Sequence, residues 1–296
     1  MAARTNNKWL ALQRASAPYL LILPALAFVV GVLAYSVLYG VGMSFFRVDL
    51  TRPGTPFVGL GNYATLYASP EFWNSLTRSL IFVFFSVVLG LVLSMSFAYA
   101  LYRTRRFSGF FKGLTLIPYL VSGIATAIMF RFIFSGNVGL VNQILQAMGF
   151  ERVLFLSSPN WALTIIILAN AWFIIPFSTL VLLAGLQSLD PEILEAARAD
   201  GATGIRVFFQ IIVPLIKPML GIALVWMSFA SFNMFDVVLP LTGGGPGNAT
   251  EVLAVHMYRV GFEFLRYSEG SAIMTVIWIL NIVTSVTLLR IFHSEE

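Results

Sequence analysis

The chain has 296 residues, of which 58% are hydrophobic and only 10% are charged. A soluble domain carries roughly a quarter charged residues, so this composition predicts an integral membrane protein. Cysteine is absent and there are only two histidines, which excludes disulfides and thiolate metal sites and leaves no histidine set at metal-ligand spacing. The net charge of +5 fits the lysine and arginine of cytoplasmic flanks better than a nucleic-acid-binding surface.

Six apolar stretches are each close to the roughly 20 residues that cross a bilayer as a helix. The sequence therefore predicts an all-α, polytopic membrane protein with a single transmembrane domain over residues 1–296. The first stretch is much longer than the apolar core of a signal peptide, so we expect it to be retained as a span. The predicted spans are residues 18–46, 76–102, 113–134, 161–186, 218–241 and 271–292.

Lysine and arginine gather in the segments that a cytoplasmic N-terminus would place inside the cell, as the positive-inside rule requires. The densest group lies between the second and third spans and comprises Arg103, Arg105, Arg106 and Lys112. With six spans, both termini then lie in the cytoplasm. The loop at residues 187–217 falls on the same side.

The last three spans contain polar and aromatic side chains that are candidates for a substrate pathway. Polar groups inside a membrane are costly and usually face the bundle interior or a water-filled cavity. Amides and carboxylates hydrogen-bond sugar hydroxyls, and aromatic rings pack on the apolar faces of sugars. Asp236 is the most exceptional of them, and Asn233, three residues earlier, would share its helical face. The alternative is that such side chains only bridge helices, worth on the order of 0.6 kcal/mol each. The candidates are Asn170, Trp172, Trp226, Asn233, Asp236, Trp278 and Asn281.

The loop between the fourth and fifth spans has the pattern of two short helices separated by a break. Asp190 and Pro191 suit the start of the first helix, and Gly201 ends it because glycine enters the left-handed region freely. We expect the second helix to end before Pro214. A short amphipathic hairpin at a membrane surface can dock into a groove of a soluble partner, whereas an ordinary solvated loop is the plain alternative.

The spacing within this loop resembles the signature of permease subunits of binding-protein-dependent ABC importers. The resemblance rests on residues 195–197 (Glu-Ala-Ala), Gly201 after three further residues, and residues 211–214 (Ile-Ile-Val-Pro) after nine more. Val213 stands where leucine is usual. The resemblance implies the type I importer fold, in which this cytoplasmic hairpin is the coupling helix and sits in a cleft of the ATPase subunit. It assigns ATPase coupling to Glu195, Ala196, Ala197, Asp200, Gly201, Ala202 and Pro214.

A glycine-rich run, Leu-Thr-Gly-Gly-Gly-Pro-Gly-Asn-Ala-Thr, follows the fifth span at residues 241–250. It does not fit a phosphate-binding loop because no Gly-Lys-Ser/Thr follows and the predicted side is outside. A tight turn at the membrane exit explains the glycines and proline equally well. Together with Tyr258, Phe262 and residues 270–272, the run resembles the carbohydrate-uptake branch of the importer permeases, where it lies at the outer mouth of the pathway. It assigns that mouth to Gly243, Gly244, Gly245 and Pro246.

No catalytic residue set, metal-ligand cluster or ATPase motif stands out, so we expect a transport subunit without its own ATPase site. The resemblance implies half of an alternating-access pathway for a sugar, oligosaccharide or polyol; glycerol 3-phosphate is also known in this branch. It further implies a second homologous permease, two ATPase subunits that carry ATP and Mg²⁺, an external solute-binding protein, and a bacterial or archaeal plasma (inner) membrane. The alternative is a self-sufficient ion-coupled secondary transporter or channel, for which only Asp236 is a plausible coupling carboxylate. An intramembrane enzyme is a distant third.

Overall fold

The computed structural model describes residues 19, 21–48, 54–104 and 108–292. In this part of the chain the regular secondary structure is helical, apart from one antiparallel bridge between Phe46 and Phe57, and turns and loops connect the helices. The start of the first predicted span, and Arg105 and Arg106 of the basic cluster, lie outside the described residues.

Four helical segments are long and apolar enough to cross a membrane, and two bent helix pairs bring the number to six if each pair is counted as one span. The segment Leu21–Met43 contains a π-helical turn, η1, and ends in α2. The other three are continuous helices that overlap the second, fourth and sixth predicted spans. They are α4 (Pro70–Arg103), α8 (Pro159–Gln187) and α15 (Tyr267–Phe292).

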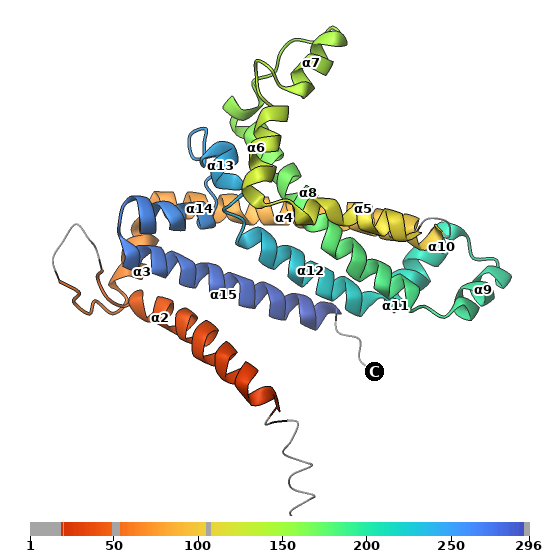
Figure 1. Cartoon of the computed structure of the whole chain (residues 1–296), viewed down its shortest axis with the longest axis horizontal. Helices are drawn as coiled ribbons and strands as arrows, with labels where there is room; N and C mark the ends of the chain where they lie inside the picture. Colours follow the sequence, from red (N-terminus) through yellow and green to blue (C-terminus); the bar gives the residue numbers. More distant parts are fainter. Residues whose placement is uncertain (1–18, 20, 49–53, 105–107, 293–296) are drawn as a thin grey trace, which may run out of the picture.

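Helix α4 lies along the long axis of the molecule and α8 crosses it obliquely, while α12 (Lys217–Phe232) packs on α4, α8 and α15 and α2 leans away from the others (Figure 1). Small residues bring α4 close to α8. A Cβ on Gly90 would lie 2.9 Å from Cδ1 of Ile174, and the Ser94 hydroxyl donates to the Ile175 carbonyl at 3.2 Å. Close packing of this kind holds membrane helices together, because lipid provides no hydrophobic force between them.

The third predicted span is two helices rather than one. Helix α5 (Ser108–Leu120) and helix α6 (Gly123–Ile133) meet at an angle of 91°. Ser122 takes an extended conformation at the junction, and its Oγ accepts a hydrogen bond from the Ala125 amide at 3.3 Å. The break therefore has a specific N-cap, although both sides of it are equally apolar.

The fifth predicted span is also interrupted. Helix α12 ends at Phe232, residues 233–237 form a turn, and the short helix α13 (Val238–Thr242) follows. Asn233 and Asp236 therefore do not share a helical face, contrary to the prediction.

A helical run also precedes α12 and meets it at 75°. The prediction that this run ends before Pro214 is wrong, because the run continues through Pro214 to Leu215, with the π-helical turn η3 directly before it. The run consists of α10 (Gly204–Val207), η3 (Phe208–Ile212) and α11 (Val213–Leu215).

The short elements gather at the two ends of the bundle (Figure 1). One end holds α9 and α10, and the opposite end holds α3, α14 and η4, while α7 projects sideways beyond α6. Further bounds are η1 (Val29–Ala34), α2 (Tyr35–Met43), α3 (Gly61–Ala68), α7 (Leu140–Ala147), η2 (Phe155–Ser157), α9 (Pro191–Ala199), α14 (Leu253–Tyr258) and η4 (Arg259–Glu263).

Candidate functional site

The loop between α8 and α12 forms the helix, break and helix that its sequence predicts. Oδ1 of Asp190 accepts a hydrogen bond from the Glu192 amide at 2.9 Å at the start of α9. Gly201 ends the helix with a φ of +77°, and the Ala202 amide closes the turn on the Ala197 carbonyl at 3.0 Å. A residue with a Cβ would be strained at Gly201, which explains the need for glycine there.

One face of this hairpin is packed on the helix bundle, and the other is open. Leu194 and Ala197 are buried in a cluster that also contains Ala98 and Leu101 of α4. Ala197 therefore packs within the chain and is not on the open face. Exposed on that face are Glu195, Ala196, Asp200 and Gly201, while Ala202 is half-buried and Pro214 is exposed beyond them.

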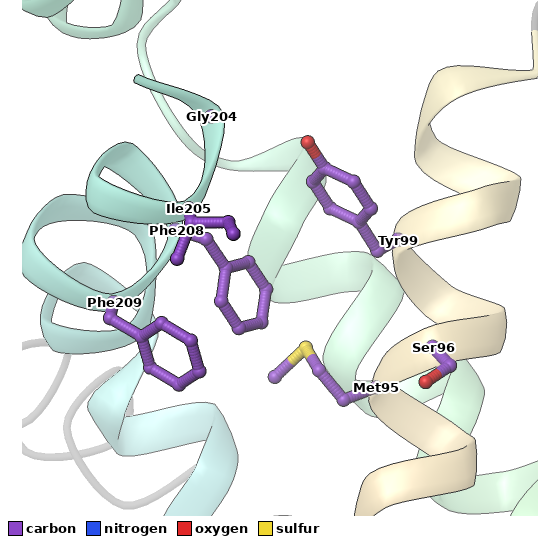
Figure 2. Close-up of a pocket in the computed structure, with 7 residues that line it drawn as sticks. All are labelled: Met95, Ser96, Tyr99, Gly204, Ile205, Phe208 and Phe209. Carbon is purple, nitrogen blue, oxygen red and sulfur yellow. The ribbon is translucent and has the colours of Figure 1, made fainter. Parts of the chain in front are cut away.

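A groove of about 360 Å³ separates α4 from the helical run after the hairpin (Figure 2). The rings of Tyr99 and Phe208 meet in it edge to face, with centroids 5.7 Å apart. A second cavity of about 320 Å³ shares Tyr99 and Gly204 and extends to Arg103 and Leu194. Between the hairpin and α4 there are therefore two cavities as well as direct side-chain contacts.

The seven predicted pathway residues do not form a single site. The Asn170 side chain is fully buried and donates to Oγ of Ser231 at 2.8 Å, which joins α8 to α12. The Asn281 amide donates to the Ile277 carbonyl of its own helix at 3.0 Å. Trp278 is 46% exposed on α15. For Asn170, this geometry matches the helix-bridging alternative.

Two of the predicted tryptophans lie in aromatic clusters beside the bend between α5 and α6. The Trp226 ring lies 4.7 Å from that of Phe177 and 6.4 Å from that of Tyr119 on α5. The Trp172 ring contacts Phe130 of α6 at 6.1 Å. Trp226 therefore lies beside the end of α5, whereas Trp172 lies beside the second half of α6.

Asn233 and Asp236 lie in the turn after α12. Asn233 is exposed, and its amide donates to the Phe229 carbonyl at 2.7 Å. Asp236 is half-buried, with its carboxylate against Gly123, where an added Cβ would lie only 1.8 Å from Oδ2. The carboxylate therefore sits at the N-terminus of α6, where the helix dipole favours negative charge.

The glycine-rich run forms a compact turn held by a charged cluster that the sequence reasoning missed. Gly243 and Gly244 have φ values of +61° and +82°. Arg259 donates to the Gly243 carbonyl and pairs with Glu251 at 2.8 Å, while Nδ1 of His256 lies 2.7 Å from the other Glu251 oxygen. The sequence does contain a signal for this cluster. Glu251, His256 and Arg259 are three ionisable residues in a short apolar stretch, where charged side chains need partners.

Further hydrogen bonds fix this turn to the bundle. The Thr250 hydroxyl donates to the Gly245 carbonyl at 2.7 Å, and the Asn74 amide of α4 donates to the Asn248 carbonyl at 3.0 Å. The Leu253 amide donates to Oγ of Ser79, also on α4, at 2.6 Å. Pro246 follows Gly245 within the same turn. Across the described residues, no three Asp, Glu or His side chains converge as metal ligands would.

The family model described as "Binding-protein-dependent transport system inner membrane component" matches residues 86–294 of the chain. The chain is 32% identical to the sulfoquinovosyl glycerol transport system permease protein SmoG of Agrobacterium fabrum, over 98% of this chain and 94% of the relative. It is 36% identical to the trehalose/maltose transport system permease protein MalF of Thermococcus litoralis, over 92% of each chain.

A solved structure of a bacterial alginate ABC transporter, in complex with an alginate pentasaccharide-bound periplasmic protein, contains a chain with the same fold. The TM-score is 0.78, the sequence identity is 23%, and the match covers 97% of this chain and 99% of that one. The sequence matches extend over the hairpin, the interrupted fifth span and the glycine-rich turn.

Proposed function

Because the chain belongs to the family of binding-protein-dependent transport system inner membrane components, we propose that it forms half of the translocation pathway of an importer for a sugar, oligosaccharide or polyol. The chain is a transport subunit, and ATP hydrolysis takes place on separate partner subunits. The observation that carries the substrate class is the near full-length similarity to relatives named for sulfoquinovosyl glycerol and for trehalose and maltose.

The open face of the hairpin is the surface that we assign to the ATPase. Glu195 and Asp200 are exposed there, and Gly201 makes the turn that presents them. The buried Leu194 and Ala197 tie the same hairpin to α4, so a force on its open face reaches the bundle. In this proposal the hairpin is the coupling helix, and it lies in the cytoplasm together with both termini.

The six predicted spans become four continuous and two interrupted crossings of the plasma (inner) membrane of a bacterium or archaeon. The pathway passes Asn233 and Asp236 at the second interruption, with Trp172 and Trp226 nearby, and opens outward past the glycine-rich turn. Alternating access requires a second, homologous permease, two ATPase subunits with ATP and Mg²⁺, and an external binding protein that delivers the solute.

The test is uptake and ATP hydrolysis by the complex reconstituted in liposomes, with substitutions in the hairpin. We expect Glu195→Ala and Gly201→Val to lower uptake at least tenfold, either through poor assembly or through ATP hydrolysis that no longer drives transport. The matched controls lie outside the hairpin: Glu151→Ala removes another exposed carboxylate, and Gly149→Val changes a glycine that also has a positive φ (+85°) and open space around its Cβ position. Normal uptake in both Glu195→Ala and Gly201→Val would refute the coupling role.

The alternative of a self-sufficient ion-coupled transporter or channel makes a separate prediction. Liposomes that contain this chain alone would then take up solute in response to an ion gradient. We expect no uptake without the ATPase subunits, and uptake by the chain alone would favour the alternative.

A further inference from the structure

Two cavities lie in a row along the last turns of α4, on the side that faces the hairpin. The first has a volume of about 360 Å³ and the second a volume of about 320 Å³. Tyr99 and Gly204 line both of them, so the two cavities adjoin, and we call the pair the α4 groove. Its second wall consists of residues between Leu194 and Ile212, from the hairpin and the helical run that follows it.

The α4 groove changes from apolar to polar along its length. At one end it is lined by Met95 and by Phe209, which is 65% exposed. The Tyr99 hydroxyl points away from both of these side chains (Figure 2). At the other end the lining includes Tyr102 and Arg103, the last residue of α4. A molecule that fits this groove therefore has an apolar part beside Met95 and a polar part beside Arg103.

Arg103 gives the polar end a positive charge that the described part of the chain does not neutralise. The guanidinium carbon lies 5.9 Å from the centre of the Tyr99 ring. Among the described residues, no Asp or Glu oxygen lies within 4.0 Å of the Arg103 side chain, and no carboxylate lines either cavity. Arginine binds phosphate oxygens through pairs of N–H groups, and basic pockets between membrane helices on the cytoplasmic side bind anionic lipid headgroups.

The length of the groove matches one leaflet of a bilayer. The rise of α4 from Met95 to Arg103 is about 12 Å, and half of a hydrocarbon core is about 15 Å. With the hairpin in the cytoplasm, as proposed above, Arg103 lies at the inner surface and Met95 at the depth of the acyl chains. Ser96 lines the groove and is exposed, so a lipid chain can enter from the side.

We propose that the α4 groove binds an anionic phospholipid of the cytoplasmic leaflet, with its phosphate at Arg103 and Tyr102 and an acyl chain beside Met95 and Phe209. The proposal rests on the function proposed above for the side of the membrane on which the groove lies. A choline lipid has the same chains, but its headgroup carries a positive charge that arginine repels, so the site selects by headgroup. Because Leu194 lines the groove, the bound lipid contacts the hairpin as well as α4.

The first test is photo-crosslinking of the assembled complex in phosphatidylcholine nanodiscs. A trace of phosphatidylglycerol with a diazirine on its acyl chain is compared with phosphatidylcholine that carries the same diazirine, and mass spectrometry locates the labelled peptides. We expect the phosphatidylglycerol probe to label residues 95–103 and 204–209 about fivefold more than the phosphatidylcholine probe, as the attraction of one arginine for an anionic lipid implies. Equal labelling by the two probes overturns the proposal.

Two variants of Arg103 and one control show whether the arginine is responsible. Arg103→Gln should abolish the preference for phosphatidylglycerol, and Arg103→Lys, which keeps the charge, should retain most of it. Arg290→Gln is the control, because Arg290 is also an exposed arginine in the last turn of a membrane helix, α15, and lines neither cavity. An unchanged preference in Arg103→Gln, or one as low in Arg103→Lys as in Arg103→Gln, overturns the phosphate contact.

The second test measures how the lipid is oriented. A phosphatidylglycerol probe with the photoreactive group on its headgroup should label residues 102–103, whereas the acyl-chain probe should label residues 95–99 and 204–209. The opposite distribution overturns the proposal. Labelling that appears only after the ATPase subunits are removed shows that the ATPase fills the groove, and this result also overturns it. Labelling is read without transport, so the lipid site can fail while uptake is normal, and the importer can fail while the labelling stands.

Discussion

Arg259 provides a direct test of how the glycine-rich turn is held. Its guanidinium joins Glu251, whose side chain is only 6% exposed, to the Gly243 carbonyl. Arg259→Met keeps an unbranched apolar stem but removes both contacts. A hydrogen bond to a charged group contributes about 1.5–3 kcal/mol. Because the Arg259 side chain is 26% exposed and Glu251 keeps His256, we reduce the sum of the two to about 2 kcal/mol.

A loss of about 2 kcal/mol raises the population of the opened turn about 30-fold. Hydrogen exchange of the assembled complex, followed by mass spectrometry, measures this change at the amides of Gly245 and Thr250. These amides are protected by the carbonyls of Thr242 and Gly244, each at 3.1 Å. We expect their exchange to accelerate about 30-fold in Arg259→Met.

Arg266→Met is the matched control, because Arg266 also pairs with a nearby carboxylate. Its partner, Glu269, is three residues away, and the Arg266 side chain is 40% exposed. An exposed pair of this kind contributes less than about 1 kcal/mol, and the exchange of residues 243–250 should not change. Unchanged exchange in Arg259→Met, or equal acceleration in Arg266→Met, would refute the assignment of Arg259 as the residue that holds the turn.

Two further predictions concern the interior of the bundle. Gly123→Ala should lower the free energy of unfolding of the chain by about 1–3 kcal/mol, because the added Cβ collides with the Asp236 carboxylate. Gly109→Ala is the control: its Cβ meets no atom within 4 Å, and the free energy of unfolding should not change. Asn170→Ala should cost about 1 kcal/mol through its bond to Ser231. Ser231→Ala should cost a similar amount, and the double variant no more than either; additive losses would show that the two side chains act separately.

Helix ends were harder to predict than the helices themselves. The second span is predicted to begin at residue 76, yet α4 begins at Pro70. Ser69 caps the helix by accepting a hydrogen bond from the Phe72 amide, and Pro70 suits the first turn. Pro159 likewise takes the first turn of α8 after Ser158, which is the N-cap residue but makes no side-chain capping bond. These serine–proline pairs were readable signals that hydropathy alone does not use.

The sequence predicted the turns of the hairpin but not its contacts with the bundle. The pattern of Asp190, Pro191 and Gly201 depends on local backbone chemistry, and the structure has the capping bond and the positive φ that this chemistry requires. Which face of α9 packs inward depends on α4, a distant segment. The burial of Leu194 and Ala197 therefore required the tertiary structure.

The breaks in the third and fifth spans lie next to each other, and a polar group from one meets the helix that begins at the other. Neither break was found from the sequence, because this contact joins segments that are far apart in the chain. The break at Ser122 lies in a uniformly apolar stretch, so hydropathy cannot mark it. Within a membrane, a broken helix frees backbone groups that need polar partners or a water-filled cavity. Asp236 lies in the other break, with its carboxylate at the first turn of α6. A carboxylate that is costly within a continuous helix thus becomes favourable where a second helix begins, and the two breaks bring polar groups together at one place along the bundle.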